Sequence, residues 1–376
     1  MPFGSEGKEA GIAVALSGGG FRAALFHLGG LWRLTELGVL PRIARMSSVS
    51  GGSIVSGVLA ANWPAFAATP TVATFRRLIE APLRTFCGRN IDATAVAGGL
   101  FNPWKSAGEV VEGMYAELLG AATLADLPEA PRFVFNSTNL QTGRTFRFSR
   151  PYMGDYRLGL IRNPTVKLAK AVAASSAFPP VLSPVVLDKP GKFEAVEGSD
   201  LNGKPEFTER ICVADGGVYD NLALETVWNR YQTLLVSDAG SPFTLAVTPE
   251  TDWIRQAMRA LDVATDQARS LRKRALIGDF TSGARQGAYW GIASDIASFR
   301  APDGEADTAL ACAPAKVGPL ATIRTRLNPF DDREQEELIN WGYAICDAAL
   351  RRHAPEVISG RAPAPGWPYP GRALGP

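Results

Sequence analysis

A strand that ends in a serine and turns at once into a helix is the feature that most constrains this chain. Residues 43–49 are typical of a buried strand, Ser50-Gly51-Gly52 follow, and residues 53–59 are typical of a helix. Such a bend needs small residues, and it leaves the serine hydroxyl exposed beside the free N–H groups of a helix N-terminus. The pattern indicates an α/β fold that presents a nucleophile. Taken alone, it also fits a plain tight turn.

A second turn of this kind comes earlier in the chain. An apolar strand pattern covers residues 11–16, Ser17-Gly18-Gly19-Gly20 follow, and apolar residues then recur at helical spacing over 21–37. Three residues without Cβ atoms let backbone N–H groups point at a small anion. In a serine esterase that anion is the tetrahedral oxyanion, and the N–H of Gly51, next to Ser50, adds a further donor.

The same glycines also fit a dinucleotide-binding fingerprint. Gly18, Gly20 and Ala23 match G-x-G-x-x-[G/A] after a first strand. That interpretation requires an acidic residue at the end of the second strand to hold the ribose hydroxyls. The second strand ends at Ser48-Val49-Ser50, and Glu36 lies earlier, inside the helix. The sequence therefore favours the oxyanion interpretation.

The alternation of strands and helices predicts a three-layer α/β/α fold with a largely parallel central sheet. Further strands are expected at 132–135, 145–148, 211–214 and 233–237, and further helices at about 165–175, 252–275 and 333–352. We expect one domain over residues 11–354, between a polar N-terminal tail (1–10) and an irregular tail rich in Pro and Gly (355–376). Within it, the Ala-rich stretch 62–130 is expected to form a helical cap or insertion.

Asp215 is the first candidate for an acid in the site. Asp215-Gly216-Gly217 follows the strand 211–214, and the glycines let the chain turn away from the carboxylate. Parallel sheets bind ligands beyond the carboxyl ends of their strands, so Asp215, Ser50 and the glycine turn are expected to converge. An Asx turn, in which Asp215 only caps the loop, is the alternative.

Two other acidic positions follow strands or precede helices. Asp238 ends the strand 233–237 and is our second choice for a catalytic acid, although a turn role is the simpler interpretation. Asp220-Asn221 is expected to cap a helix that begins near Leu222.

Only two histidines are available to complete a catalytic triad. His353 follows two arginines at the end of a predicted helix, where a surface position is expected. His27 lies in the first helix, roughly 10 Å past the glycines along the axis, which favours a packing role. If neither serves, Asp215 must accept the serine proton itself, as a general base.

Composition excludes several classes of protein. The chain has 39 Lys and Arg against 37 Asp and Glu, and it has no basic run with interleaved aromatics, which argues against nucleic-acid binding. The four cysteines are widely spaced, which indicates neither a disulfide framework nor a zinc site. The polar N-terminus lacks a signal sequence, and no stretch reaches the ~18 apolar residues of a membrane span. We therefore expect a soluble, cytoplasmic protein, with any membrane contact limited to a surface.

Four blocks of the sequence together resemble the patatin-like phospholipase family, over about residues 11 to 240. They are Ser17-Gly18-Gly19-Gly20-Phe21-Arg22-Ala23, Ser48-Val49-Ser50-Gly51-Gly52-Ser53, Ala173-Ala174-Ser175-Ser176-Ala177-Phe178-Pro179-Pro180 and Ala214-Asp215-Gly216-Gly217-Val218-Tyr219-Asp220-Asn221. Ser48 departs from the glycine of plant patatins and is more similar to the cytosolic-phospholipase branch.

The resemblance implies a patatin-like fold and a Ser–Asp dyad in place of a triad. Ser50 would be the nucleophile, Asp215 its base, and Gly18, Gly19 and Gly20 the oxyanion donors. The implied reaction is hydrolysis of carboxylic esters of phospholipids or related lipids through an acyl-enzyme, with no cofactor and no metal. Two alternatives stay open, an acyltransferase on the same dyad and a lipid- or nucleotide-binding module without turnover.

Substrate contacts are assigned to Arg22 and Gly51. Arg22 either meets a substrate phosphate or steadies the glycine loop, by an ion pair or a core contact. In the cap, the apolar side chains form either an acyl pocket or lid or ordinary helix packing; they are Phe66, Phe75, Leu78, Ile79, Leu83, Phe86, Leu100, Phe101 and Trp104. The helix 253–274 either adsorbs to anionic lipid through its cations or, as we favour, forms a solvated outer layer; those cations are Arg269, Arg272, Lys273 and Arg274.

Overall fold

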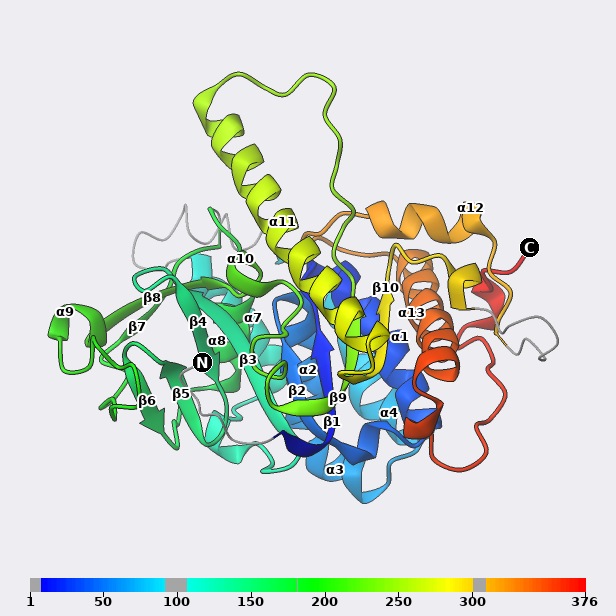
Figure 1. Ribbon diagram of the computed structural model, residues 1–376, viewed down its shortest axis with the longest axis horizontal. Helices are drawn as coiled ribbons and strands as arrows, with labels where there is room; N and C mark the ends of the chain where they lie inside the picture. Colours follow the sequence, from blue (N-terminus) through cyan, green and yellow to red (C-terminus); the bar gives the residue numbers. More distant parts are fainter. Residues whose placement is uncertain (1–7, 92–106, 181, 300–308) are drawn as a thin grey trace.

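A ten-stranded sheet forms the centre of the molecule (Figure 1). The computed structural model describes residues 8–91, 107–180, 182–299 and 309–376. The strands are β1 (Glu9–Leu16), β2 (Ile43–Ser48), β3 (Arg132–Asn139), β4 (Arg144–Phe148), β5 (Tyr152–Asp155), β6 (Gly159–Arg162), β7 (Val185–Asp188), β8 (Arg210–Asp215), β9 (Tyr231–Asp238) and β10 (Gln286–Gly291).

The sheet has a parallel part and an antiparallel part. Strands β10, β9, β1, β2 and β3 are neighbours in that order, and every pair among them is parallel. From β3 onward, β4, β5 and β6 follow as antiparallel neighbours. The expected largely parallel sheet is thus confirmed. Strands β5, β6, β7 and β10 were not predicted; β5, β6 and β7 are only four residues long, and β10 has glycines at two of its six positions.

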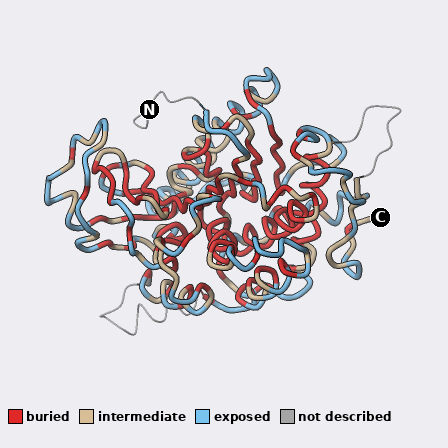
Figure 2. The backbone as a smooth tube through the Cα atoms, turned by 90° about the horizontal axis from the view of Figure 1, so that it is seen from below, coloured by how far each residue is buried: buried red, intermediate tan, exposed pale blue. Residues whose placement is uncertain are grey.

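Helices cover both faces of the sheet, which confirms the three-layer fold. The helices are α1 (Gly20–Glu36), α2 (Gly51–Ala61), α3 (Trp63–Ala68), α4 (Val72–Phe75), α5 (Ala81–Cys87), α7 (Ala107–Leu119), α8 (Leu168–Ser175), α9 (Pro205–Thr208), α10 (Gly217–Asp220), α11 (Trp253–Thr281), α12 (Pro314–Val317) and α13 (Asp332–His353). The larger core lies between one face and α1, α2, α7, α8 and α13. On the other face, a smaller core packs under the segment 222–231 and the end of α11. Figure 2 shows buried residues, in red, concentrated in the interior of the molecule, with exposed residues around its periphery.

The direction of β8 differs from the expectation of a parallel strand. β8 pairs antiparallel with β3, with Asp215 opposite Ser137, whereas β2 pairs parallel with β3 and ends with Ser48 opposite Phe135. β3 extends past the end of β2, and β8 pairs with the part of β3 that β2 does not reach. The carboxyl ends of β2 and β8 therefore approach each other from opposite directions around Asn136.

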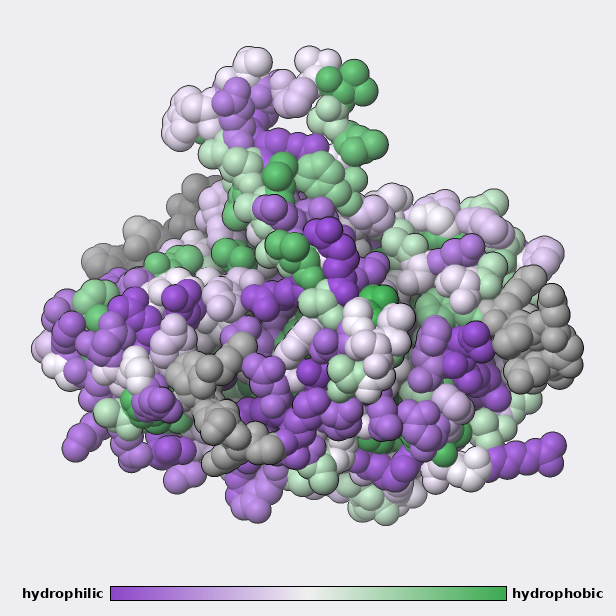
Figure 3. All heavy atoms as spheres, in the orientation of Figure 1, coloured by the Kyte–Doolittle hydropathy of each residue, from purple (hydrophilic) through white to green (hydrophobic). Residues whose placement is uncertain are grey.

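Helix α11 leaves the body of the molecule at its N-terminal end (Figure 1). The loop from β9 runs outward, and α11 returns from its far end toward the sheet. In Figure 3 this projection stands clear of the surface and carries hydrophobic residues, in green, along the loop. None of the described helices is both long enough and apolar enough to cross a bilayer.

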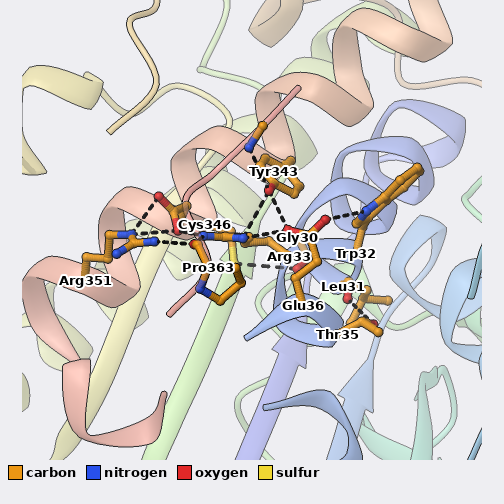
Figure 4. A network of polar contacts seen from close by, with 12 residues as sticks. Gly30, Leu31, Trp32, Arg33, Thr35, Glu36, Tyr343, Cys346, Arg351 and Pro363 are labelled. Atoms are coloured by element: carbon orange, nitrogen blue, oxygen red, sulfur yellow. Dashed lines mark hydrogen bonds and ion pairs between the residues drawn. The ribbon is translucent and has the colours of Figure 1, made fainter. Parts of the chain in front are cut away.

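Buried ionic contacts join the first and last long helices (Figure 4). Arg33 of α1 is buried; its Nε donates to Asp347 of α13 at 2.7 Å, and its guanidinium also donates to Glu36 and to the carbonyl of Pro363, each at 2.6 Å. The Tyr343 ring lies 5.2 Å from the same guanidinium. The tail after α13 lies against the body through such contacts.

Candidate active site

Ser50 lies on a strained bend between β2 and α2. Its backbone has φ 52° and ψ −123°, in a region that residues with side chains seldom occupy. The bend is held because the Ser50 N–H donates to the carbonyl of Ser175 at 3.1 Å, and because the Gly52 N–H donates to the Ser17 carbonyl at 3.1 Å. The side chain lies at the N-terminus of α2 with 9% of its surface exposed. This is the geometry in which a hydrolase presents a nucleophile.

Close backbone contact explains the glycine that follows Ser50. A Cβ atom on Gly51 would lie 2.0 Å from the carbonyl oxygen of Gly20, so any side chain there would force the two turns apart. Gly19 has φ 142° and Gly20 has φ 59°, which are backbone conformations that favour glycine. The glycine turn after β1 and the serine bend after β2 are therefore packed directly against each other.

The amides of this region differ in what they contact. The Gly18 N–H already donates to the carbonyl of Asn221 at 3.1 Å. Within the described part of the chain, the N–H groups of Gly19, Gly20 and Gly51 have no acceptor. Of the three glycines predicted as oxyanion donors, Gly18 is thus engaged elsewhere, and the other two have free amides, as has Gly51.

Asp215 is buried next to the serine bend. Its carboxylate is 1% exposed, and Oδ1 accepts the Gly217 N–H at 2.7 Å, which is the Asx turn considered above. Burial raises the pKa of Asp215 to about 6, against the lowering effects of the Ser50 hydroxyl and the Gly217 N–H. The Ser50 hydroxyl is thus within interaction range of the carboxylate. Oδ2 makes no hydrogen bond of standard geometry to any described residue, so the serine–carboxylate contact is a loose one.

Ser175, at the end of α8, joins the two halves of this site. Its carbonyl accepts from the N–H groups of both Ser50 (3.1 Å) and Gly216 (3.3 Å). Its hydroxyl donates to the carbonyl of Asn136 at 2.7 Å and lies 2.8 Å from the Ser53 hydroxyl. Sequence reasoning gave Ser175 no role of its own. The small-residue block around it was the available signal, but that block did not indicate which strands Ser175 contacts.

Asn136 is the second residue that sequence reasoning missed. It lies on β3 between the ends of β2 and β8, and its side-chain amide donates to the Ser48 carbonyl at 3.0 Å and to the Ser47 hydroxyl at 2.9 Å. Two residues further along β3, the Thr138 hydroxyl donates to the Asp215 carbonyl at 2.8 Å. The run of polar residues that follows Phe135 was the signal for this half of the strand.

Arg22 is fully buried beneath the glycine turn. Its guanidinium donates to the carbonyls of Ala239 (2.7 Å) and Ile323 (2.6 Å) and to the Ser241 hydroxyl (2.6 Å). Burial lowers the pKa of Arg22 to about 10, which leaves the guanidinium charged at neutral pH. These contacts are those of a residue that holds the turn in place. A role for Arg22 in binding substrate stays a prediction.

Neither histidine contacts Ser50 or Asp215. His27 is buried, with Nε2 3.0 Å from the Ser17 carbonyl and Nδ1 2.7 Å from the Ser237 hydroxyl. Because a carbonyl only accepts, Nε2 carries the proton; burial lowers the pKa of His27 to about 4, so the ring is neutral. The His353 ring packs edge-on against Phe299 at the end of α13.

The other acids have local partners. Asp238 accepts from the Gly240 N–H and from the Tyr289 hydroxyl, both at 2.8 Å, which is a turn role. The helix expected near Leu222 is absent, since residues 221–230 form turns, and that prediction was wrong. Asp220 instead accepts from the N–H groups of Leu222 and Glu225, because the short α10 ends before this segment.

The cap residues that the structure describes belong to the core. Phe66, Phe75, Ile79, Leu83 and Phe86 are buried in the main hydrophobic cluster, and Leu78 packs at its edge, which favours ordinary helix packing. Leu100, Phe101 and Trp104 lie outside the described residues. Over the described ranges, no group of three or more His, Cys, Asp or Glu side chains is arranged to hold a metal ion.

Three of the four cations considered on α11 contact the rest of the protein, whereas Arg274 is exposed. Arg269 donates to the carbonyl of Ser241, Arg272 pairs with Asp220 and Glu225, and Lys273 lies 4.7 Å from the centre of the Tyr289 ring. These contacts favour an outer layer over the sheet for this half of the helix.

A three-layer α/β fold with a serine on a strand-to-helix bend is an architecture of serine hydrolases. The family model for patatin-like phospholipases matches residues 14–228, which is more than half of the chain. The chain belongs to the patatin-like phospholipase family. Among curated proteins, none matches the sequence.

Solved structures of two proteins resemble the fold. Human GIVD cytosolic phospholipase A2, in complex with methyl gamma-linolenyl fluorophosphonate and terbium chloride, is 14% identical with a TM-score of 0.48, and the match covers 90% of this chain and 57% of that one. VipD from Legionella pneumophila is 14% identical with a TM-score of 0.39, and the match covers 92% and 67%. The chain thus spans less than two thirds of the human protein's length.

Proposed function

We propose that the protein hydrolyses carboxylic esters of phospholipids or related lipids through an acyl-enzyme on Ser50, with Asp215 as the base. Membership of the patatin-like phospholipase family supports lipid esters as the substrate class. The observation that carries the mechanism is a strained serine beside a buried carboxylate whose pKa is raised to about 6, with no imidazole in contact with either.

In the first half of the reaction, Ser50 Oγ attacks the ester carbonyl and Asp215 accepts the hydroxyl proton. The negative charge on the carbonyl oxygen is stabilised by the free amides of the two turns, those of Gly19, Gly20 and Gly51. As the tetrahedral intermediate collapses, the ester C–O bond breaks and Asp215 returns the proton to the leaving alcohol.

In the second half, water replaces the alcohol. Asp215 takes a proton from the water as its oxygen attacks the acyl-serine carbonyl, and that proton then passes to Ser50 Oγ as the fatty acid departs. Each bond formed is matched by one broken, and the chain's own groups supply every proton transfer. In the free protein the serine–carboxylate contact is loose, and such contacts often tighten only in the substrate complex.

The test is labelling and turnover of matched variants. The native protein should react with a fluorophosphonate probe and hydrolyse p-nitrophenyl esters, whereas Ser50→Ala should lose both. Asp215→Asn should lower kcat by about 10²–10⁴-fold. Ser56→Ala changes a buried serine six residues further along, in α2; it is the control and should keep the probe reaction.

Full turnover by Ser50→Ala or Asp215→Asn, with unchanged melting temperature, would reject the dyad. Absence of any reaction with the probe in the native, folded protein would instead favour a binding module without turnover.

A further inference from the structure

The projection on the surface is built from the loop after β9 and the start of α11. We define the projecting hairpin as residues 241–263. It stands away from the rest of the molecule in Figures 1 and 3. The contacts that hold α11 to the body come from its later half, where Arg272 pairs with Asp220 and where Leu276 is buried.

Large apolar side chains are exposed at the far end of the projecting hairpin. Leu245 is 87% exposed, Val247 is fully exposed, and Trp253 and Ile254 are 79% and 55% exposed. These are the most exposed large apolar residues of the described chain. Single exposed apolar residues are ordinary, but a gathering of them on one protruding element marks an interaction site.

The two cations of the projecting hairpin have local partners. Arg255 pairs with Glu250 at 2.8 Å and with Asp252 at 2.9 Å, and the Arg259 guanidinium lies 4.2 Å from the centre of the Phe243 ring. Residues 241–263 hold three acidic and two basic side chains, so the hairpin has a net charge of −1. The hairpin therefore has no excess of positive charge with which to bind an anionic surface.

The base of the projecting hairpin is bonded to the candidate active site. Arg22, in the helix that starts at the glycine turn, donates to the carbonyl of Ala239 and to the hydroxyl of Ser241. Arg269, on the part of α11 that packs on the body, donates to the Ser241 carbonyl at 2.8 Å. The projecting hairpin thus follows the carboxyl end of β9, at the same edge of the sheet as Ser50. A partner bound at the far end of the hairpin would therefore lie on the same side of the molecule as the candidate active site.

We propose that the projecting hairpin inserts Leu245, Val247, Trp253 and Ile254 into the surface of a lipid bilayer. Tryptophan and branched apolar side chains partition into the bilayer interface. A narrow convex end buries little area against a flat protein surface, whereas it displaces lipid headgroups readily. The choice of a bilayer rests on the proposed function, since phospholipid esters are held in bilayers. Because the hairpin has a net charge of −1, binding depends on apolar insertion and not on anionic lipid.

The experiment measures co-sedimentation with phosphatidylcholine vesicles, which carry no net charge. Ser50→Ala is the parent, so that lipid is not consumed. We expect the parent to bind at low and high salt alike, and Leu245→Ser with Trp253→Ser to lower the partition coefficient by about tenfold per side chain. Leu140→Ser, at a 48% exposed leucine on the β3–β4 turn, is the matched control and should bind like the parent.

A second measurement separates this proposal from the proposed function. The same hairpin and control substitutions are made in the protein that keeps Ser50, and their turnover of a soluble ester is measured. Loss of vesicle binding with full soluble-ester turnover supports insertion. Vesicle binding by the hairpin variant equal to that of the parent would overturn the insertion proposal and leave the enzyme proposal standing.

If the parent instead self-associates without lipid, and Leu245→Ser with Trp253→Ser abolishes this, a second copy of the chain is the occupant and the bilayer proposal is wrong. Hairpin-dependent vesicle binding by a protein that never turns over soluble ester would support insertion and reject the enzyme.

Discussion

At the scale of single residues, Asp215 combines burial with reactivity. A carboxylate in water is a weak base, and burial strengthens it by raising its pKa to about 6. The same shift has a cost in stability. Because the folded pKa lies above the ordinary value, the protonated carboxyl favours folding, and that contribution, about 3 kcal/mol, is lost as pH rises through about 6. The site is thus least stable in the pH range where we propose that it reacts.

We expect the pH dependence of activity to follow the ionisation of Asp215. Only the ionised carboxylate accepts a proton, so kcat/KM on a soluble ester should rise with pH and level off above an apparent pKa of about 6. Burial and the neighbouring Arg352 lower the pKa of His353 below the ordinary histidine value of 6.5, so this ring could also titrate in the acidic range. His353→Gln is therefore the control and should leave the curve unchanged. A flat profile between about pH 5 and 7, or one that moves in His353→Gln, would contradict this assignment.

At the scale of elements, the end of α8 determines the distance between the serine bend and the acid. Ser175 contacts the first residue of the bend, the strand between the two ends, and the residue after Asp215. We expect Ser175→Ala to leave the Asn136 carbonyl without its buried donor and to lower the free energy of unfolding by about 1–3 kcal/mol. It should also lower kcat with little change in KM, because positioning and not binding is altered.

The neighbouring serine provides the comparison. Ser176 is also buried, and its hydroxyl contacts Tyr115 and the Val172 carbonyl instead of the bend. Chemical denaturation and steady-state kinetics of both variants give the answer. Equal kcat values for Ser175→Ala and Ser176→Ala would show that Ser175 contributes only to stability.

At the scale of the whole molecule, the two ends of the chain are joined across the main core. The buried Arg33–Asp347 pair links α1, which starts at the glycine turn, to α13 near the C-terminus. Asp347→Asn leaves the buried Arg33 guanidinium with Glu36 as its remaining carboxylate partner, so it should destabilise the protein by about 1.5–3 kcal/mol, the range for a hydrogen bond to a charged group. Glu337→Gln breaks the exposed Arg333 pair on the same helix and should cost below about 1 kcal/mol. Similar denaturation midpoints for the two variants would contradict this ranking.

Much of the element order followed from local pattern. The strand–glycine–helix segments at β1–α1 and β2–α2 were predicted within one or two residues at most ends, because apolar periodicity and small-residue turns are encoded over short stretches. The helix expected at 252–275 is α11, which continues to Thr281, and the helix expected at 333–352 is α13; both were predicted for the same reason. The helix expected at Leu222 failed because Asp220 caps a turn as readily as a helix.

By itself, the sequence determined which residues are candidates: a serine and glycines on tight bends and an acid at the end of a strand, since these depend on neighbours along the chain. Only the tertiary structure decided how they meet. β8 reaches the site antiparallel to β3, the Gly18 amide is taken by Asn221, Arg22 is buried under the turn, and the start of α11 leaves the body. Each of these depends on pairing between residues far apart in the chain, where edge geometry and burial outweigh any local preference.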